Sequence, residues 1–115
     1  YFDRHTGPDG CTALSIAQAA EAGDETARLV YKRCGDYLGR GLALLMDLLN
    51  PECVVLGSIF VRAAKWLWPA AEQMIAREAL PASRAACRVL PAALGEELGD
   101  YAALATAFYK GEEDR

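Results

Sequence analysis

Residues 25–57, with the sequence ETARLVYKRCGDYLGRGLALLMDLLNPECVVLG, contain the pattern that decides the fold. From Glu25 to Leu49, apolar residues recur at steps of three and four, which predicts one helix of about 40 Å. Asn50-Pro51 ends this helix, because proline disfavours helical geometry in the residue before it. The apolar run at 53–57 follows and predicts a short strand that is buried on both faces. A long helix followed by a buried strand indicates an α/β domain.

The long helix carries Gly35, Gly39 and Gly41, although glycine costs about 1 kcal/mol relative to alanine in a helix interior. Two interpretations remain open. Another backbone packs closely against these glycines, or the glycines only make the helix more flexible. The second half of the helix, including LALLM at 42–46, is apolar on all sides and must be covered on most of them. A dimer interface is one way to cover it.

Shorter elements flank this central pair. The other predicted helices cover residues 12–21, 59–79 and 100–110, and a second predicted strand covers residues 88–90. Asp24 is expected to cap the long helix, and Pro69 marks either a kink or a restart of the helix that contains it. The last helix is predicted to be buried through its apolar residues Ala103, Leu104 and Ala107. The expected order is α-α-β-α-β-α, mainly helical, with a right-handed parallel βαβ unit.

Two strands make a poor sheet, so we expect further strands from elsewhere. The sequence starts at Tyr1 instead of methionine and shows no signal-peptide pattern, and we expect it to be a piece of a longer chain. We divide it into an irregular segment at 1–11, one half-domain at 12–110 and a charged tail at 111–115. Missing sheet partners and the uncovered residues 42–49 predict self-association.

Composition agrees with a mainly helical domain and disfavours several classes of protein. The 115 residues include 22 Ala and 15 Leu but only 12 β-branched residues, too few for a sheet-dominated fold. No apolar run approaches the roughly 20 residues that cross a bilayer, which argues against a membrane protein. The formal net charge of −4 disfavours a dedicated nucleic-acid-binding surface.

The four cysteines, Cys11, Cys34, Cys53 and Cys87, lie far apart and form no Cys-x-x-Cys pair. With His5 as the single histidine, this spacing predicts no zinc site. Four cysteines would also suit a secreted disulfide framework, but Cys34 and Cys53 lie in apolar periodic segments. We therefore favour free, buried thiols in a cytoplasmic protein.

A ligand site is expected where the first strand ends, at Gly57, Ser58 and Ile59. In open α/β sheets, ligands bind beyond the carboxyl ends of the strands. Gly57 allows close approach to the backbone, and N–H groups at the following helix start favour phosphate or ribose oxygens. The other interpretation of this Gly-Ser pair is a plain turn.

Other candidates for chemistry are few, since the sequence has no nucleophile motif, no Gly-rich phosphate loop and no paired carboxylates. Asp47 is interpreted as the partner of a nearby base and Asp100 as the cap of the last helix. Trp66 and Trp68 cannot face the same way on one helix. We expect one of them in the core and the other against a partner.

Taken together, residues 19–58 and 90–108 resemble the carboxy-terminal part of the ROK family of sugar kinases and sugar-responsive repressors. The matching motifs are Gly23-Asp24, Leu38-Gly39, Asn50-Pro51-Glu52, the strand with Gly57, and Leu98-Gly99-Asp100 with Ala102-Ala103. This resemblance implies a partial ribonuclease H-like domain, that is, half of an actin/hexokinase-like ATPase domain, with a long central helix.

The resemblance further implies the nucleotide-side fragment of an ATP-dependent sugar kinase, a transferase that uses ATP with Mg²⁺. It implies that Gly57 and Ser58 line the adenosine pocket, with Ile59 nearby and the start of the terminal helix, at Asp100, close to the cleft. The family often has glycine where this chain has Ser58, Ile59 and Ala105. The family's phosphate loop, catalytic aspartate and zinc motif have no counterpart here, so we expect this chain alone to be inactive.

Two alternatives remain open. The first is a sugar-sensing transcriptional regulator of the same family, whose DNA-binding part would lie upstream, so that this segment itself makes no nucleic-acid contact. The second is a non-catalytic dimerisation module. We expect a cytoplasmic homo-oligomer that does not contact a membrane, with a sugar as the substrate or ligand of the intact protein.

Overall fold

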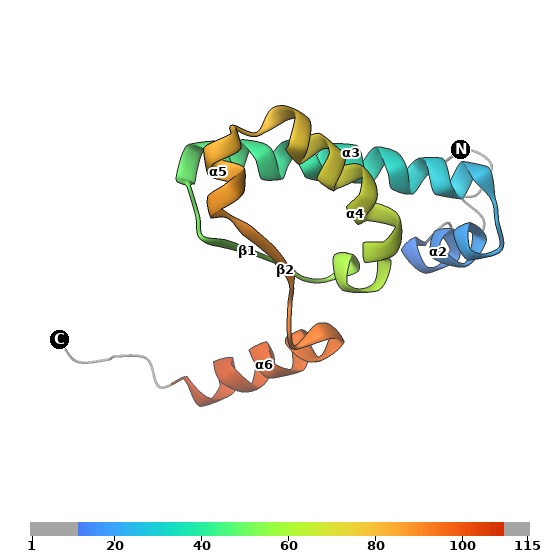
Figure 1. Cartoon of the computed structure of the whole chain (residues 1–115). Helices are drawn as coiled ribbons and strands as arrows, with labels where there is room; N and C mark the ends of the chain where they lie inside the picture. The colour runs from blue at the N-terminus through green and yellow to red at the C-terminus, as the bar shows by residue number, and fades with distance from the viewer. Residues whose placement is uncertain (1–11, 110–115) are drawn as a thin grey trace.

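The computed structural model describes residues 12–109 of the chain. Its elements are α2 (Ala13–Glu21), α3 (Glu25–Leu49), β1 (Cys53–Leu56), α4 (Ile59–Glu78), α5 (Pro81–Ala86), β2 (Arg88–Pro91), the 3₁₀ helix η1 (Gly95–Glu97) and α6 (Leu98–Phe108). Helices predominate, and the strands form a small parallel sheet, so the predicted mainly helical α/β class is confirmed (Figure 1).

Helix α3 has the predicted bounds, and local capping explains both of its ends. The backbone N–H of Ala27 donates to Oδ1 of Asp24 at 2.7 Å, which satisfies one of the free N–H groups of the first turn. At the other end, Asn50 adopts the left-handed conformation, with a φ of 43°, and its N–H donates to the carbonyl of Met46. Pro51 follows, so the helix cannot continue.

Helices α3 and α4 pack along their main chains. A Cβ added at Gly35 would lie 2.9 Å from Cβ of Ala70, and one at Gly39 would lie 2.6 Å from Cβ of Met74. Both added atoms would also collide with backbone carbonyl groups of α4. Close approach of another backbone is therefore confirmed for these two glycines. The same prediction is wrong for Gly41, because a Cβ added there would meet nothing within 4 Å.

Helix α4 continues through Pro69 without a restart. Beyond it, Leu80 leads directly into α5, which was not predicted and which begins with Pro81. Asp47 helps to hold this junction, because its Oδ1 accepts a hydrogen bond from the backbone N–H of Leu80 at 3.0 Å. The prediction that Asp47 pairs with a base is wrong, since its partner is this amide.

The sheet is parallel, with Cys53 opposite Arg88 and Leu56 opposite Pro91. On one face, Val54, Leu56 and Val89 pack against buried residues of the helices. The other face is open, because Val55 is 61% and Leu90 is 43% exposed. The predicted burial of the first strand on both faces is therefore wrong for the described residues, since no element covers this second face.

The core consists of two clusters of buried residues. The first contains Ala20, Ala27, Tyr31, Phe60, Ala63 and Leu67, and the second contains Leu42, Ala43, Met46, Ile75 and Ala79. Leu38, Leu56 and Trp68 pack against both clusters. Helices α3 and α4 contribute to both clusters, so the pair forms the centre of the domain.

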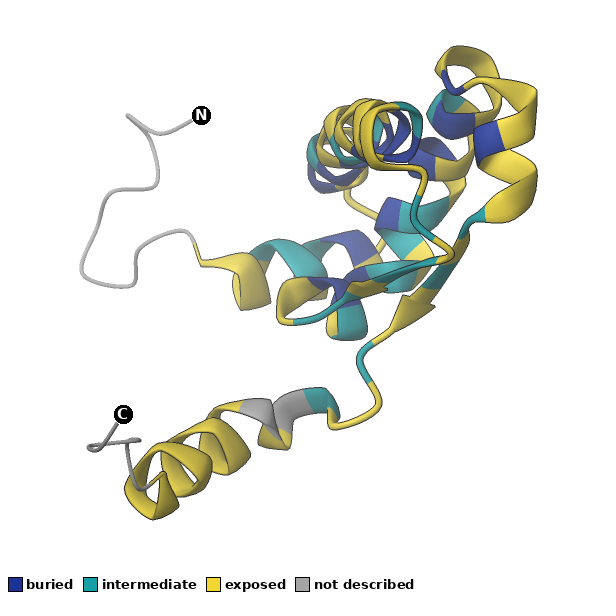
Figure 2. Ribbon diagram, turned by 90° about the vertical axis from the view of Figure 1, so that its left-hand side faces the viewer, coloured by how far each residue is buried: buried dark blue, intermediate teal, exposed yellow. Residues whose placement is uncertain are grey.

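Helix α6 stands apart from the other helices (Figures 1 and 2). It starts at Leu98 instead of Asp100, and Glu97 occupies the N-cap position, so the predicted cap at Asp100 is wrong. Burial through Ala103, Leu104 and Ala107 is also wrong, because all three are exposed. The helix is mostly apolar, yet η1 is the one element for which contacts with it are recorded among the described residues.

Three cysteines belong to the described residues, and all three are free. Cys53 and Cys87 are partly buried, but Cys34 is exposed, so its predicted burial is wrong. Cys11 and His5 lie outside the described residues. Between residues 12 and 109, no group of three His, Cys, Asp or Glu side chains could hold a metal ion. None of the helices described for this chain is long and apolar enough to span a membrane.

Candidate functional site

The turn between β1 and α4 contains three of the predicted site residues. Ser58 has a φ of 55° and a ψ of −130°, a backbone conformation that glycine adopts far more readily than serine. The carbonyls of Gly57 and Ser58 accept hydrogen bonds from the N–H groups of Phe60 and Val61, at 3.3 and 3.2 Å. The turn is thus fixed by its own backbone, and Ser58 is strained within it.

Ser58 and Ile59 line a hollow of about 320 Å³ at the start of α4. Its other lining residues are Ala13, Leu14 and Ala17 of α2, Tyr31 of α3, and Arg62 and Ala63 of α4. The lining is mostly apolar, and its polar or charged residues are Tyr31, Ser58 and Arg62. This size lies at the lower end of the range for small-molecule pockets, roughly 300–1,000 Å³.

Tyr31 joins two walls of this hollow. Its side chain is buried, and its hydroxyl donates a hydrogen bond of 3.2 Å to the backbone carbonyl of Ala13. Burial raises the pKa of the Tyr31 phenol above its usual value, and the neighbouring Cys34 thiol raises it further. Tyr31 therefore stays protonated and acts as a hydrogen-bond donor to α2.

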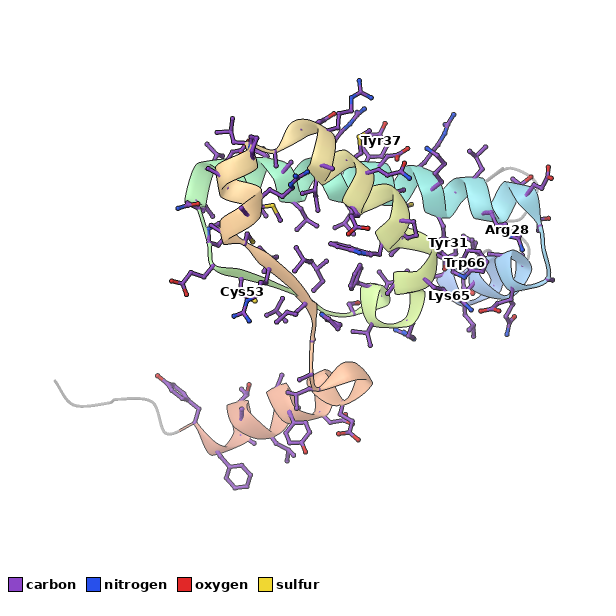
Figure 3. The ribbon with its side chains drawn as sticks, viewed as in Figure 1. Arg28, Tyr31, Tyr37, Cys53, Lys65 and Trp66 are labelled. Carbon is purple, nitrogen blue, oxygen red and sulfur yellow. The ribbon has the colours of Figure 1, made fainter. Side chains whose placement is uncertain are left out.

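Contacts at the far end of α2 hold it against α3 and α4. Nε of Arg28 donates to the carbonyl of Ala20 at 3.1 Å, and Lys65 forms an ion pair with Glu21. Two cations lie near the ring of Trp66, with Cζ of Arg28 at 5.4 Å and Nζ of Lys65 at 5.3 Å from its centroid (Figure 3). These contacts fix α2 beside the hollow.

Both tryptophans are partly buried and pack against the first core cluster, but their other neighbours differ. Trp68 packs against both core clusters and meets the ring of Phe60 edge-on, at 6.1 Å between centroids. Trp66 lies in the cation-lined junction, and its Nε1 is buried without a hydrogen-bond partner among the described residues. A partner contact for either tryptophan stays a prediction.

The predicted site residues separate into two groups. Ser58 and Ile59 lie together on the wall of the hollow, and Gly57 precedes them without lining it. Asp100 is exposed in the first turn of α6 and does not line the hollow. Their roles in nucleotide binding stay predictions.

Sequence reasoning missed the contribution of α2 and of Tyr31. Leu14 of α2 is 65% exposed and borders the hollow. The available signal for Tyr31 was its hydroxyl on the otherwise apolar face of α3, since a buried tyrosine hydroxyl usually has a partner.

Comparison with known proteins identifies the family of this chain. A family model described as "ROK family" matches residues 3–108. The chain belongs to the ROK family. The predicted resemblance is thereby confirmed, over nearly the whole chain.

Curated ROK relatives of this chain are named as regulators. The DNA-binding transcriptional dual regulator NagC of Escherichia coli K12 is 33% identical over 105 residues, which cover 90% of this chain and 26% of NagC. The N-acetylglucosamine repressor of Shigella flexneri has the same identity and coverage. The DNA-binding transcriptional repressor Mlc of E. coli K12 is 38% identical over 71 residues, 62% of this chain and 18% of Mlc.

A solved structure agrees with this assignment. The crystal structure of a ROK family transcriptional regulator, a homolog of the E. coli MLC protein, matches with a TM-score of 0.60 and 33% identity. The match covers 66% of this chain and 19% of that one, which supports a partial ROK fold. The chain spans about a quarter of the length of the curated relatives NagC and the N-acetylglucosamine repressor. These ROK proteins agree with the regulator alternative, and none of them supports the sugar kinase.

Proposed function

We propose that this chain is the carboxy-terminal part of a ROK transcriptional regulator that responds to a sugar. The alignment with DNA-binding regulators over 90% of the chain, at 33% identity, carries this proposal. Contacts with DNA and with the sugar are made by other parts of the regulator. The net charge of −4 of this chain fits that division, because a DNA-binding surface is normally basic. The regulator works in the cytoplasm, where it reaches its DNA.

The turn after β1 gives independent support for a regulator over a kinase. A phosphate-binding turn at a helix start offers bare backbone N–H groups to its ligand, and glycine keeps them accessible. Here Ser58 and Ile59 place side chains at this point, and Ser58 does so in a backbone conformation that favours glycine. A regulator needs no phosphoryl transfer and tolerates this loss of an open turn. In this proposal the hollow beside α2 does not serve catalysis.

A ROK sugar kinase is the second candidate, and the position of the hollow favours it. Ser58 and Ile59 line a space large enough for a small ligand, next to the carboxyl end of a strand, where α/β proteins bind nucleotides. In that case Gly57, Ser58 and Ile59 would contact the adenosine of ATP, Asp100 would lie near the cleft, and Mg²⁺ would shield the phosphates. Phosphate would then pass to a sugar hydroxyl.

Two assays on the intact protein that carries this chain separate the candidates. Binding to fluorescently labelled promoter DNA is measured by anisotropy, alone and with each member of a sugar panel that includes N-acetylglucosamine. Sugar-dependent formation of ADP from ATP and Mg²⁺ is measured with the same panel. We expect specific DNA binding that one sugar class weakens, and no sugar-dependent ADP formation. Sugar-dependent ADP formation without DNA binding would establish the kinase, and a protein that does neither would overturn both candidates.

A further inference from the structure

A second hollow lies between α4 and strand β2, and we call it the β2 hollow. It has a volume of about 380 Å³, within the range of small-molecule pockets. Its lining residues are Phe60, Ala64, Lys65, Trp68 and Pro69 of α4, with Val89 and Pro91 of β2. It shares no lining residue with the hollow that Ser58 lines, because the two hollows lie on opposite sides of α4. The β2 hollow is therefore a separate candidate site.

The walls of the β2 hollow are mainly apolar and aromatic. Phe60 is buried, and Trp68 meets it edge-on with 6.1 Å between the ring centroids. Of the residues that line this hollow, Lys65 alone carries a charge, and its ammonium group is engaged by Glu21 and lies near the ring of Trp66 (Figure 3). A phosphate would find no free cation on these walls, and a sugar would leave most of its hydroxyl groups without partners. The lining fits an uncharged ring.

Pro69 gives the β2 hollow one polar feature. Helix α4 runs continuously through Pro69, which has no N–H to donate to the carbonyl of Lys65, four residues earlier. That carbonyl loses its usual helical donor, and the proline ring forces it away from the helix axis. Both residues line the β2 hollow, so this acceptor lies at its wall. A ligand with one hydroxyl or N–H group can supply the missing hydrogen bond.

We propose that the β2 hollow binds a neutral aromatic compound with a single hydrogen-bond donor, of which a phenol is the simplest form. Its hydroxyl donates to the Lys65 carbonyl, and its ring packs against Phe60 and Trp68 in the edge-on or offset arrangements that aromatic rings prefer. Burial of the ring supplies most of the affinity, and the hydrogen bond selects compounds that carry a donor. This site goes beyond the proposed sugar response, since it adds a chemically different ligand, and its failure would leave the proposed regulator unaffected.

Two compounds of the same shape test the hydrogen bond on the wild-type chain. 4-Methylphenol carries the donor, whereas 4-methylanisole has a methyl ether in its place. Titration of the purified ¹⁵N-labelled chain, followed by NMR, measures both dissociation constants from amide shifts. We expect millimolar binding of 4-methylphenol, with shifts concentrated at Ala64, Lys65, Trp68 and Val89, and about fivefold weaker binding of 4-methylanisole through loss of one hydrogen bond.

Three outcomes of this titration would overturn the proposal. The first is the absence of a saturable shift up to the solubility limit of 4-methylphenol. The second is equal affinity for the two compounds, which would remove the role of the Lys65 carbonyl. The third is a set of shifts concentrated at Ser58 and Ile59, which would place the ligand in the other hollow.

Pro69→Ala separates the hydrogen bond from apolar binding. Alanine restores an N–H at residue 69 that occupies the Lys65 carbonyl within the helix. The variant should therefore still bind 4-methylphenol but lose the fivefold preference over 4-methylanisole. Its helix should remain intact by circular dichroism, because it gains a helical hydrogen bond. A preference that persists in Pro69→Ala would contradict the assigned acceptor.

A filled hollow tests the location. Ala64→Trp places an indole ring in the β2 hollow and should abolish binding of both compounds. Ala76→Trp, at an exposed position of the same helix outside the hollow, is the matched control and should leave both affinities unchanged. Binding retained by a folded Ala64→Trp variant would overturn the proposal. If that variant fails to fold, the titration of the wild-type chain and Pro69→Ala still decides the question.

Discussion

Gly39 of α3 packs directly against the backbone of Ala71 in α4. The two longest helices therefore meet main chain to main chain, with no side chain between them at this point. Because both core clusters include residues of these two helices, the spacing set at Gly39 affects most of the core.

The first prediction concerns this contact. Gly39→Ala should lower the free energy of unfolding by about 1–3 kcal/mol, because the added methyl group overpacks the contact with Ala71 and Met74. Gly41→Ala is the matched control and should raise the free energy of unfolding by up to about 1 kcal/mol in the monomer. Urea denaturation at low protein concentration measures both. Equal stability of the two variants would contradict the packing described for Gly39.

A second prediction tests the strained turn at the start of α4. Ser58→Gly should increase the free energy of unfolding by about 1 kcal/mol, because glycine adopts a φ of 55° without strain. Ala76→Gly, at an exposed position inside the same helix, should lower it by about 0.5–1 kcal/mol. Thermal unfolding followed by circular dichroism compares the two. A loss of stability in Ser58→Gly would mean that the serine side chain stabilises the turn.

The third prediction follows from the raised pKa of Tyr31. Below about pH 10, the usual pKa of tyrosine, the phenol is neutral in the folded and the unfolded state. Its burial then contributes fully to the free energy of unfolding. Above that pH the unfolded chain ionises first, so stability falls as the pH rises toward the higher pKa of the folded state. Tyr31→Phe should flatten this decline above about pH 10. It should also cost about 1 kcal/mol at neutral pH through loss of the hydrogen bond to Ala13.

Tyr37→Phe is the control for this measurement, because Tyr37 is 71% exposed. It should retain the wild-type dependence of the free energy of unfolding on pH. If Tyr31→Phe also retains it, burial of the Tyr31 phenol does not contribute to alkaline unfolding.

A fourth prediction compares two leucines in different environments. Leu67 is 5% exposed in the first core cluster, and Leu67→Ala should cost about 2–5 kcal/mol. Leu104 is 54% exposed on α6, and Leu104→Ala should change the free energy of unfolding by less than about 0.5 kcal/mol. Denaturant titration of the purified chain measures both. A cost above 1 kcal/mol at Leu104 would show that α6 is covered in solution.

The bounds of α3 and the parallel pairing of the strands could be predicted because their signals are local. Apolar spacing marks the body of α3, Asp24 marks its start and Asn50-Pro51 marks its end. A strand, a connecting helix and a second strand then favour parallel pairing. Helix α5 was missed because Leu80-Pro81 reads equally well as the end of one helix and as the first turn of the next.

Burial was predicted less well, since it depends on what covers an apolar side chain. Val55 and Leu104 have the residue types of a core, but they are exposed because no described element lies over them. The candidate site shows the same limit. The strand end at Ser58 was found from general rules for α/β folds. The walls supplied by Leu14 and Tyr31 come from parts of the chain that only tertiary folding brings to Ser58.

Trp68, Leu38 and Leu56 pack against both core clusters, and this has a consequence for cooperativity. Neither half of the domain can open without removing neighbours from these three side chains, so local openings near α2 and near α5 are energetically linked. Hydrogen exchange should then be slowest for the amides around Leu38 and should report the unfolding of the whole domain. In this sense the domain behaves as a single folding unit, held together at its midpoint.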